Sequence, residues 1–236
     1  MTTCVAKADW DRLWQGGFDY QPLTGWERSV FAELAVLLAE RARDGLNMLS
    51  VGCGRAVIDY WLHVVFGERV TALDTSSTCL RQIRQKQCAG LLCVQADAMR
   101  LPFGERAFSV VHNEGLLEHF PDEEVGPLVA ELARCTDQCL LLVQPYAGCR
   151  PYILAKTWLE QNNRWQWGYE QPRTTLAGWV EPCGLRVVAE KTIGTQQTNE
   201  NYLNMCPPGV ARELRQQLSE AEMQVGPHLM AVAVRD

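Results

Sequence analysis

The 236-residue sequence has no long apolar run and no stretch that reads as a secretory signal. Its longest purely apolar runs, such as 140–143, are far shorter than the ~20 residues that a membrane-spanning helix needs. The N-terminus has no charged region followed by an apolar one. We therefore expect a cytoplasmic protein that does not enter a membrane.

Positive charge and paired cysteines are also scarce. The formal net charge is -6 and the pI is near 5.3, which argues against nucleic acid and favours a small-molecule substrate. None of the ten cysteines forms a CxxC pair, so no disulfide framework, zinc site or other metal site is expected. The sequence is compatible with a monomer or a homodimer.

Short apolar runs of strand length alternate with stretches of helical periodicity. Strands are expected at 47–51, 69–73, 91–95, 108–112, 139–143, 185–193 and 228–234, and helices at 24–43, 57–66, 77–87 and 122–137. The connection at 95–107 is expected to be mostly loop. This alternation predicts one doubly wound, Rossmann-like α/β domain over 1–236, with a seven-stranded, mostly parallel sheet and helices on both faces.

The first motif is LSVGCGRAVIDYWL at residues 49–62, where a buried strand turns into a helix through Gly52, Cys53 and Gly54. Glycines allow a positive φ and let a ligand approach the backbone closely. A tight turn without a ligand would show the same pattern. By itself this motif is therefore compatible with any nucleotide-binding α/β protein.

The second motif is Asp74, at the end of the next strand and twenty residues beyond Gly54. A carboxylate at this position can accept hydrogen bonds from both hydroxyls of a ribose. The dinucleotide fingerprint would require glycine at position 57, where this chain has Val57. A nucleoside ligand without phosphates is therefore favoured over a nicotinamide dinucleotide.

The third motif covers 95–122, where Asp97 and the small Ala98 follow the third strand and LPF leads into the fourth. Asp97 and Ala98 could bind the exocyclic amine of an adenine and leave room for the adenine ring. The carboxyl ends of four parallel strands then share one edge, where ligands of open α/β sheets bind. The residues expected at that edge are Gly52, Gly54, Asp74, Asp97, His112 and Asn113.

Together these motifs resemble the class I S-adenosylmethionine-dependent methyltransferases, in particular their small-molecule group, from about residue 46 to residue 144. The resemblance implies an antiparallel last strand, S-adenosylmethionine as methyl donor and S-adenosylhomocysteine as product. It also implies that Asp74 binds the ribose and that Asp97 and Ala98 bind the adenine. The residues expected to bind the cofactor are Ser50, Gly52, Cys53, Gly54, Asp74, Thr75, Asp97, Ala98 and Asn113.

The chain departs from the family pattern at three positions. Ser50 replaces the usual acidic residue before the glycine loop, Ala56 replaces the third glycine, and Ser109 replaces an aspartate. These changes favour the alternative hypothesis of a methyltransferase-fold module that binds without catalysis. A cysteine-based metalloid methyltransferase is a further alternative, but no thiol pair has suitable spacing.

His119 is the first candidate for a general base, because it follows the fourth strand and histidine titrates near neutral pH. It could instead cap the helix that begins at Asp122. His112, at the end of the fourth strand, and Glu114 are weaker candidates. A buried, hydrogen-bonded role is the alternative for His112.

Aromatic residues are concentrated in 146–172 and in 1–22. The first segment is predicted to be a lid over the acceptor and the second a cover on the other side, since indole rings exclude water and stack on flat molecules. A small extra hydrophobic core or a dimer contact would explain 146–172 equally well. The residues assigned to the lid are Trp14, Tyr20, Tyr146, Trp158, Trp165, Trp167 and Tyr169. The sequence thus predicts methyl transfer to oxygen, nitrogen or carbon of a small molecule.

Overall fold

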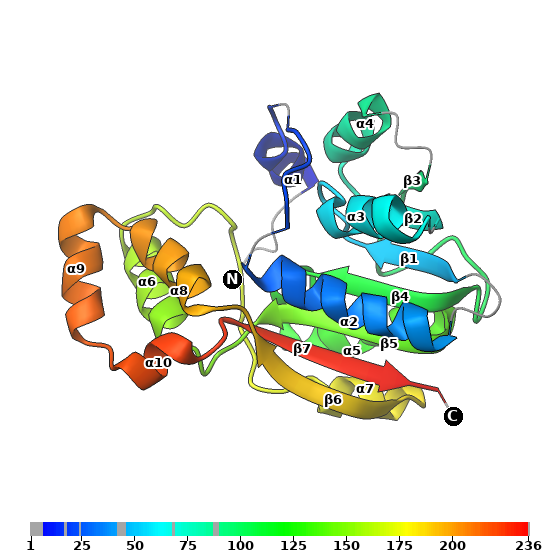
Figure 1. The fold of residues 1–236 in the computed structure, drawn as a ribbon. Coiled ribbons are helices and arrows are strands. Elements are labelled where there is room, and N and C mark those ends of the chain that lie inside the picture. Colours follow the sequence, from blue (N-terminus) through cyan, green and yellow to red (C-terminus); the bar gives the residue numbers. More distant parts are fainter. Residues whose placement is uncertain are drawn as a thin grey trace.

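The computed structural model describes residues 7–16, 18–23, 25–41, 46–67, 69–86 and 90–235. Seven strands form one sheet (Figure 1). They are β1 (Asn47–Val51), β2 (Arg69–Asp74), β3 (Leu91–Gln95), β4 (Phe108–Glu114), β5 (Thr136–Pro145), β6 (Arg186–Ile193) and β7 (His228–Val234). All seven lie where the apolar runs predicted them, with β5 extended at both ends.

The strand order is β3-β2-β1-β4-β5-β7-β6. The pairs β1–β2, β1–β4, β2–β3 and β4–β5 are parallel, whereas β7 is antiparallel to both β5 and β6. This confirms the predicted Rossmann-like sheet with its antiparallel last strand. The order reverses between β1 and β4, and the carboxyl ends of these two strands leave the crevice in which open α/β sheets bind ligands.

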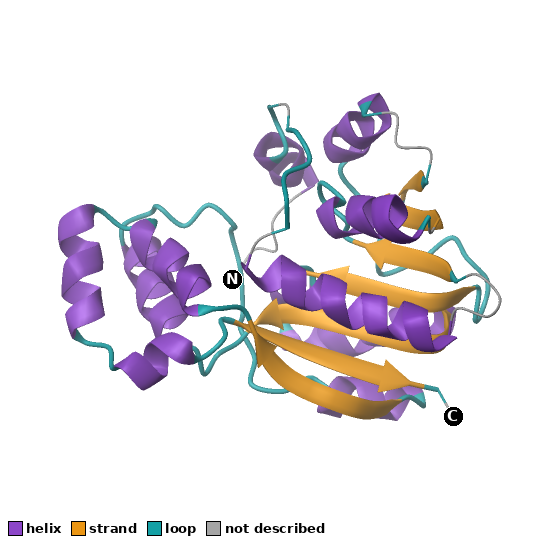
Figure 2. Cartoon of the chain, viewed as in Figure 1, coloured by secondary structure: helices purple, strands orange, loops and turns teal. Residues whose placement is uncertain are grey.

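Helices cover both faces of the sheet, as predicted (Figure 2). One apolar cluster joins the sheet to α2 (Gly25–Arg41), α3 (Val57–Phe66) and α4 (Ser77–Gln85). A second cluster joins the opposite face to α5 (Asp122–Cys135), α7 (Ala177–Val180) and the 3-10 turn η2 (Glu181–Cys183). Another 3-10 turn, η1 (Leu117–His119), follows β4. The two clusters bury the sheet between layers, so its carboxyl edge is where a ligand can enter.

A group of four helices lies beyond the carboxyl ends of β4 and β5 (Figure 1). It consists of α6 (Arg150–Gln161), α8 (Gln196–Asn204), α9 (Pro208–Gln216) and α10 (Glu220–Gln224). Its buried centre includes Ala155, Leu159 and Leu203, with Trp158 packed against it. The segment predicted as a lid therefore begins with a helix that builds a small extra core, the alternative that the sequence left open.

The short helix α1 (Lys7–Leu13) lies near α4, above the carboxyl edge of the sheet (Figure 1). Asp11 accepts hydrogen bonds from the Ser76 hydroxyl and, at 3.1 Å, from the Thr78 amide at the beginning of α4. Among the helices in the described ranges, none combines the length and apolar character needed to cross a membrane.

Candidate active site

A cavity of about 830 Å³ opens at the carboxyl edge of the sheet. Its walls come from the ends of β1, β2 and β4, from α1, from the loop after α6 and from α8. Such a volume lies in the range of small-molecule and cofactor pockets. Glycines and carboxylates form one part of the wall, and tryptophans form another.

The glycine loop after β1 is fixed to β2 by two hydrogen bonds. The amides of Gly52 and Cys53 both donate to the carbonyl of Leu73, at 2.8 and 3.0 Å. Gly52 and Gly54 adopt φ values of 69° and 49°, a region that favours glycine. A Cβ on Gly54 would lie 3.0 Å from the ring of Trp14, so the backbone is closely covered there.

Asp74 connects this loop to the beginning of α4. Its two carboxylate oxygens accept from the amides of Gly54, at 2.9 Å, and Ser76, at 2.8 Å. Burial raises the pKa of the carboxyl, although the backbone donors partly offset this effect. An ionised carboxylate has about four acceptor sites. Asp74 therefore keeps acceptor capacity for further donors such as ribose hydroxyls.

Seven of the nine residues assigned to the cofactor line the cavity. They are Gly52, Cys53, Gly54, Asp74, Thr75, Asp97 and Ala98. The other two are buried beside it. Ser50 is inside the sheet, and Asn113 donates from its side-chain nitrogen to the carbonyl of Val51 at 2.9 Å. Asn113 thus supports the carboxyl end of β1 from β4.

His112 is fully buried between two carboxylates that face the cavity. Its Nε2 lies 3.1 Å from Asp59 Oδ1 on α3, and its Nδ1 lies 2.8 Å from Glu114 Oε1. Burial acts to lower its pKa, but the two carboxylates outweigh burial and raise it to about 10. His112 is therefore an imidazolium at neutral pH and a poor proton acceptor. It lies opposite Ser50 in the β1–β4 register.

Trp14 and Phe18 cover the glycine loop and its neighbour Arg55 from outside. Trp14 lines the cavity over Gly54, and its carbonyl accepts from Gln82 Nε2 at 2.7 Å. The Arg55 guanidinium lies 5.6 Å from the centre of the Trp14 ring and 5.2 Å from that of Phe18. Such distances allow cation–π attraction. These contacts hold Trp14 above the loop.

The other part of the cavity is lined by Trp10, Trp26, Trp165 and Trp167. His119 is at this end, with the Trp10 ring at 4.7 Å in an edge-on arrangement. His119 Nδ1 lies 2.7 Å from the carbonyl oxygen of Tyr169, which can only accept, so Nδ1 carries the proton. Burial lowers the pKa of His119 to about 4. The ring is therefore neutral, with Nε2 as its basic nitrogen.

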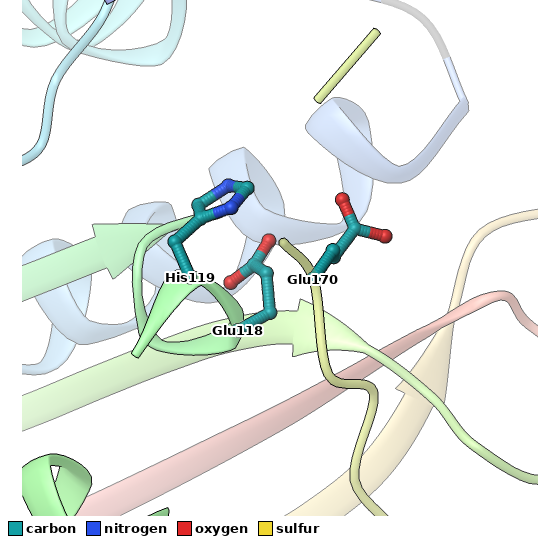
Figure 3. Close-up of side chains that lie close together, drawn as sticks. All are labelled: Glu118, His119 and Glu170. Atoms are coloured by element: carbon teal, nitrogen blue, oxygen red, sulfur yellow. The ribbon is translucent and has the colours of Figure 1, made fainter. Parts of the chain in front are cut away.

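Two carboxyl groups lie beside His119 (Figure 3): Glu118 is buried and Glu170 is half-buried. Burial, together with the charge of Glu170, raises the pKa of Glu118 well above its ordinary value. Burial also raises the pKa of Glu170 to about 7, and the Tyr152 hydroxyl donates to this carboxylate. The ligating atoms of Glu118, His119 and Glu170 lie within 4.8 Å of one another.

The structure divides the residues assigned to the lid into two groups. Trp14, Trp165 and Trp167 line the cavity. The other four are absent from its described lining: Tyr20 stacks on Tyr60 of α3, Trp158 packs on the helical group, Tyr146 packs against the sheet, and Tyr169 contributes its carbonyl to His119. Their side chains are held by elements that the sequence did not predict as neighbours.

Several residues of the cavity carried no signal in the sequence. Asp59 is within a helix, and Glu170 is in a segment selected for its aromatic residues. Tyr202 comes from α8, which was not predicted, and its hydroxyl lies 3.1 Å from His228 Nε2. His228 also lines the cavity. Only the fold brings these side chains to the strand ends.

Residues 48–138 match the methyltransferase domain family. The demethylmenaquinone methyltransferase of Desulfitobacterium hafniense (strain Y51) is 32% identical over 118 residues, which are 47% of this chain and 43% of that protein. The chain therefore aligns with less than half the length of this curated relative.

Two crystal structures resemble the whole chain. Magnesium protoporphyrin IX methyltransferase from Synechocystis PCC 6803, with bound S-adenosylhomocysteine, has a TM-score of 0.65 at 18% identity. The match covers 97% of this chain and 93% of the chain in that structure. A protein from Galdieria sulphuraria, assigned as a sarcosine dimethylglycine methyltransferase, has a TM-score of 0.66 at 13% identity, with 97% and 98% covered. Residues 48–138 thus match a methyltransferase domain family, and the chain as a whole has the Rossmann-like fold of these two methyltransferase structures. The resemblance indicated by the motifs is confirmed.

Proposed function

We propose that the protein transfers a methyl group from S-adenosylmethionine to oxygen, nitrogen or carbon of a small-molecule acceptor. The observation that carries this proposal is the position of Asp74, whose carboxylate is hydrogen-bonded to the glycine loop and lines the same cavity as the tryptophans. One cavity thus combines a wall that suits a nucleoside with a wall of aromatic side chains. The three compared proteins are named as methyltransferases of demethylmenaquinone, of magnesium protoporphyrin IX and of sarcosine dimethylglycine, which supports a small-molecule acceptor.

The residues at the strand ends fit the adenosyl part of the donor. The glycine loop allows close approach to the backbone, Asp74 can accept from two ribose hydroxyls, and Ala98 leaves space for a flat ring beside Asp97. Asp59 and Glu114 face the cavity from α3 and β4, and His112 holds them in place. These carboxylates could pair with the ammonium group of the donor. They would supply the negative charge that the family usually has at the position of Ser50.

The donor supplies an activated methyl on a sulfonium, so the S–CH₃ bond breaks with its electron pair remaining on sulfur while the acceptor atom forms the new bond. The protein's contribution is alignment, which can lower a barrier by several kcal/mol. Trp10, Trp165 and Trp167 would hold a flat or apolar acceptor and exclude water. His119 lies at this aromatic end of the cavity and activates the acceptor.

The test is turnover with methyl-labelled S-adenosylmethionine and a library of small acceptors. Formation of S-adenosylhomocysteine together with a labelled product is expected, and His119→Ala should reduce turnover far more than donor affinity. Donor binding without S-adenosylhomocysteine formation across the library would favour the non-catalytic binding module instead. Wild-type turnover by His119→Ala would remove this residue from the reaction.

A further inference from the structure

Glu118, His119 and Glu170 form a group of three potential metal ligands at the aromatic end of the cavity. Glu118 and His119 come from η1, and Glu170 comes from the loop after α6, so the fold brings the third donor in from a distant part of the chain. Glu118 is 3% exposed and His119 is 5% exposed. Figure 3 shows the Glu118 carboxylate between the other two side chains, all of which line the cavity.

The Glu118 carboxyl group has an unsatisfied oxygen that a bound cation would satisfy. Its Oε2 is buried and has no hydrogen-bond partner among the described residues. Leaving a buried polar atom unsatisfied costs about 1–3 kcal/mol, and more for a charged group. The two nearby cations have other partners: Arg173 donates to Asp122 at 2.9 Å, and Lys156 pairs with Glu160. A positive ligand in the cavity would compensate the carboxylate.

The histidine is held as a metal ligand would be. Histidines that bind metals through one ring nitrogen almost always donate the other N–H to a carboxylate, backbone carbonyl or water. His119 Nδ1–H donates to the Tyr169 carbonyl at 2.7 Å, which fixes the tautomer and makes Nε2 the coordinating atom. One imidazole and two carboxylates suit zinc, manganese or iron(II).

We propose that Glu118, His119 and Glu170 bind a divalent transition-metal ion at the acceptor end of the cavity. No metal site was expected from the sequence, because its cysteines lack metal-ligand spacing. The ligating atoms lie up to 4.8 Å apart, so side-chain rotation would bring them to bonding distance. Open coordination positions would face the tryptophans.

The role of the ion rests on the proposed function. An ion here would coordinate an oxygen of the acceptor and lower the pKa of a hydroxyl group. The hydroxyl proton would pass to solvent, the oxygen would form the O–CH₃ bond, and the S–CH₃ pair would remain on sulfur. The acceptor class is therefore a hydroxylated molecule with a flat ring that fits between Trp10, Trp165 and Trp167. His119 then acts as a ligand of the ion.

The experiment is titration of the EDTA-treated 236-residue protein with Zn²⁺, Mn²⁺ and Co²⁺, followed by calorimetry and by the visible spectrum of Co²⁺. One ion per chain is expected, with Co²⁺ d–d bands that differ from those of the hexaaqua ion. Glu118→Gln, Glu170→Gln and His119→Ala should each weaken binding by more than the ~10–100-fold that loss of an outer-shell partner costs. The matched control is Glu123→Gln, an exposed carboxylate on α5, which should change affinity less than twofold.

Thermal unfolding of each variant shows whether it is folded, so that weak binding is counted only in folded protein. The proposal is overturned if folded wild-type protein binds none of the three ions, or if Glu118→Gln and Glu123→Gln bind equally well. S-adenosylhomocysteine is titrated separately. Metal binding without adenosyl binding would support the metal site and reject the proposed function. Adenosyl binding without metal binding would reject the metal site and leave the proposed function standing.

Discussion

At the scale of single residues, Asp74 makes the contacts on which donor binding depends. Its carboxylate accepts from the amides of Gly54 and Ser76, and burial raises its pKa. Asp74→Asn keeps the shape and removes the charge and half of the acceptor capacity. We expect S-adenosylhomocysteine affinity to fall by about 1–3 kcal/mol, which is roughly 5- to 150-fold, in calorimetric titration. Asp137→Asn, a half-buried position at the opposite end of the sheet, is the control. Equal affinities for both variants would reject the ribose assignment.

His112 makes stability depend on pH. Its ordinary pKa of 6.5 is raised to about 10 in the folded protein, where Glu114 and Asp59 outweigh burial. The ion pairs therefore stabilise the fold fully below about pH 6.5, and this stabilisation declines as the pH rises toward 10. The free energy of unfolding in urea should exceed that of His112→Gln by more at pH 6 than at pH 9. A difference that stays constant or grows with pH would contradict the imidazolium assignment.

The sequence predicted site residues well where position in a strand determines position in space. Gly52, Gly54, Asp74 and Asp97 each end a strand or follow one, and parallel strands align their carboxyl ends at one edge. Glu170 could not be predicted in this way, because its place depends on the path of a loop. The protonation of His112 also depends on Asp59, which comes from a different element.

At the scale of elements, the Asp11 side chain joins α1 to the beginning of α4. Asp11 accepts hydrogen bonds from the Ser76 hydroxyl and the Thr78 amide. It thereby satisfies a backbone donor in the first turn of α4. Losing this contact costs about 1 kcal/mol, so Asp11→Ala should release S-adenosylhomocysteine about 5-fold faster in stopped-flow measurements. The exposed neighbour Gln15→Ala is the control. An unchanged release rate for Asp11→Ala would show that α1 does not cover the cavity.

The helical group behind the cavity has a core of its own. Leu159 on α6 is 2% exposed and packs with residues of α8 and α9. Leu159→Ala should destabilise this group by about 2–4 kcal/mol, because it leaves a cavity. Hydrogen exchange should then rise in α6, α8 and α9 while β1–β5 stay protected, whereas Leu128→Ala in the main core should raise it in the sheet. Equal changes in both regions would mean that the group unfolds only with the sheet.

The strands and the helices between them were predictable because each shows a clear period and a clear end. Val57–Phe66 was predicted with its observed ends, and α2 and α4 end within two residues of expectation. The helices α8, α9 and α10 were missed because they are short and polar, and their apolar residues meet those of α6 only after folding. Long-range packing of this kind leaves little periodicity in the sequence.

At the scale of the whole molecule, one cavity joins the proposed nucleoside site at the strand ends to the proposed acceptor site among the tryptophans. Calorimetric titration with S-adenosylmethionine, S-adenosylhomocysteine and NAD tests this most directly, in protein shown to be folded and free of endogenous ligand. We predict micromolar binding of both adenosyl ligands with one site per chain, and no binding of NAD. Absence of adenosyl binding, or a preference for NAD, would contradict the account.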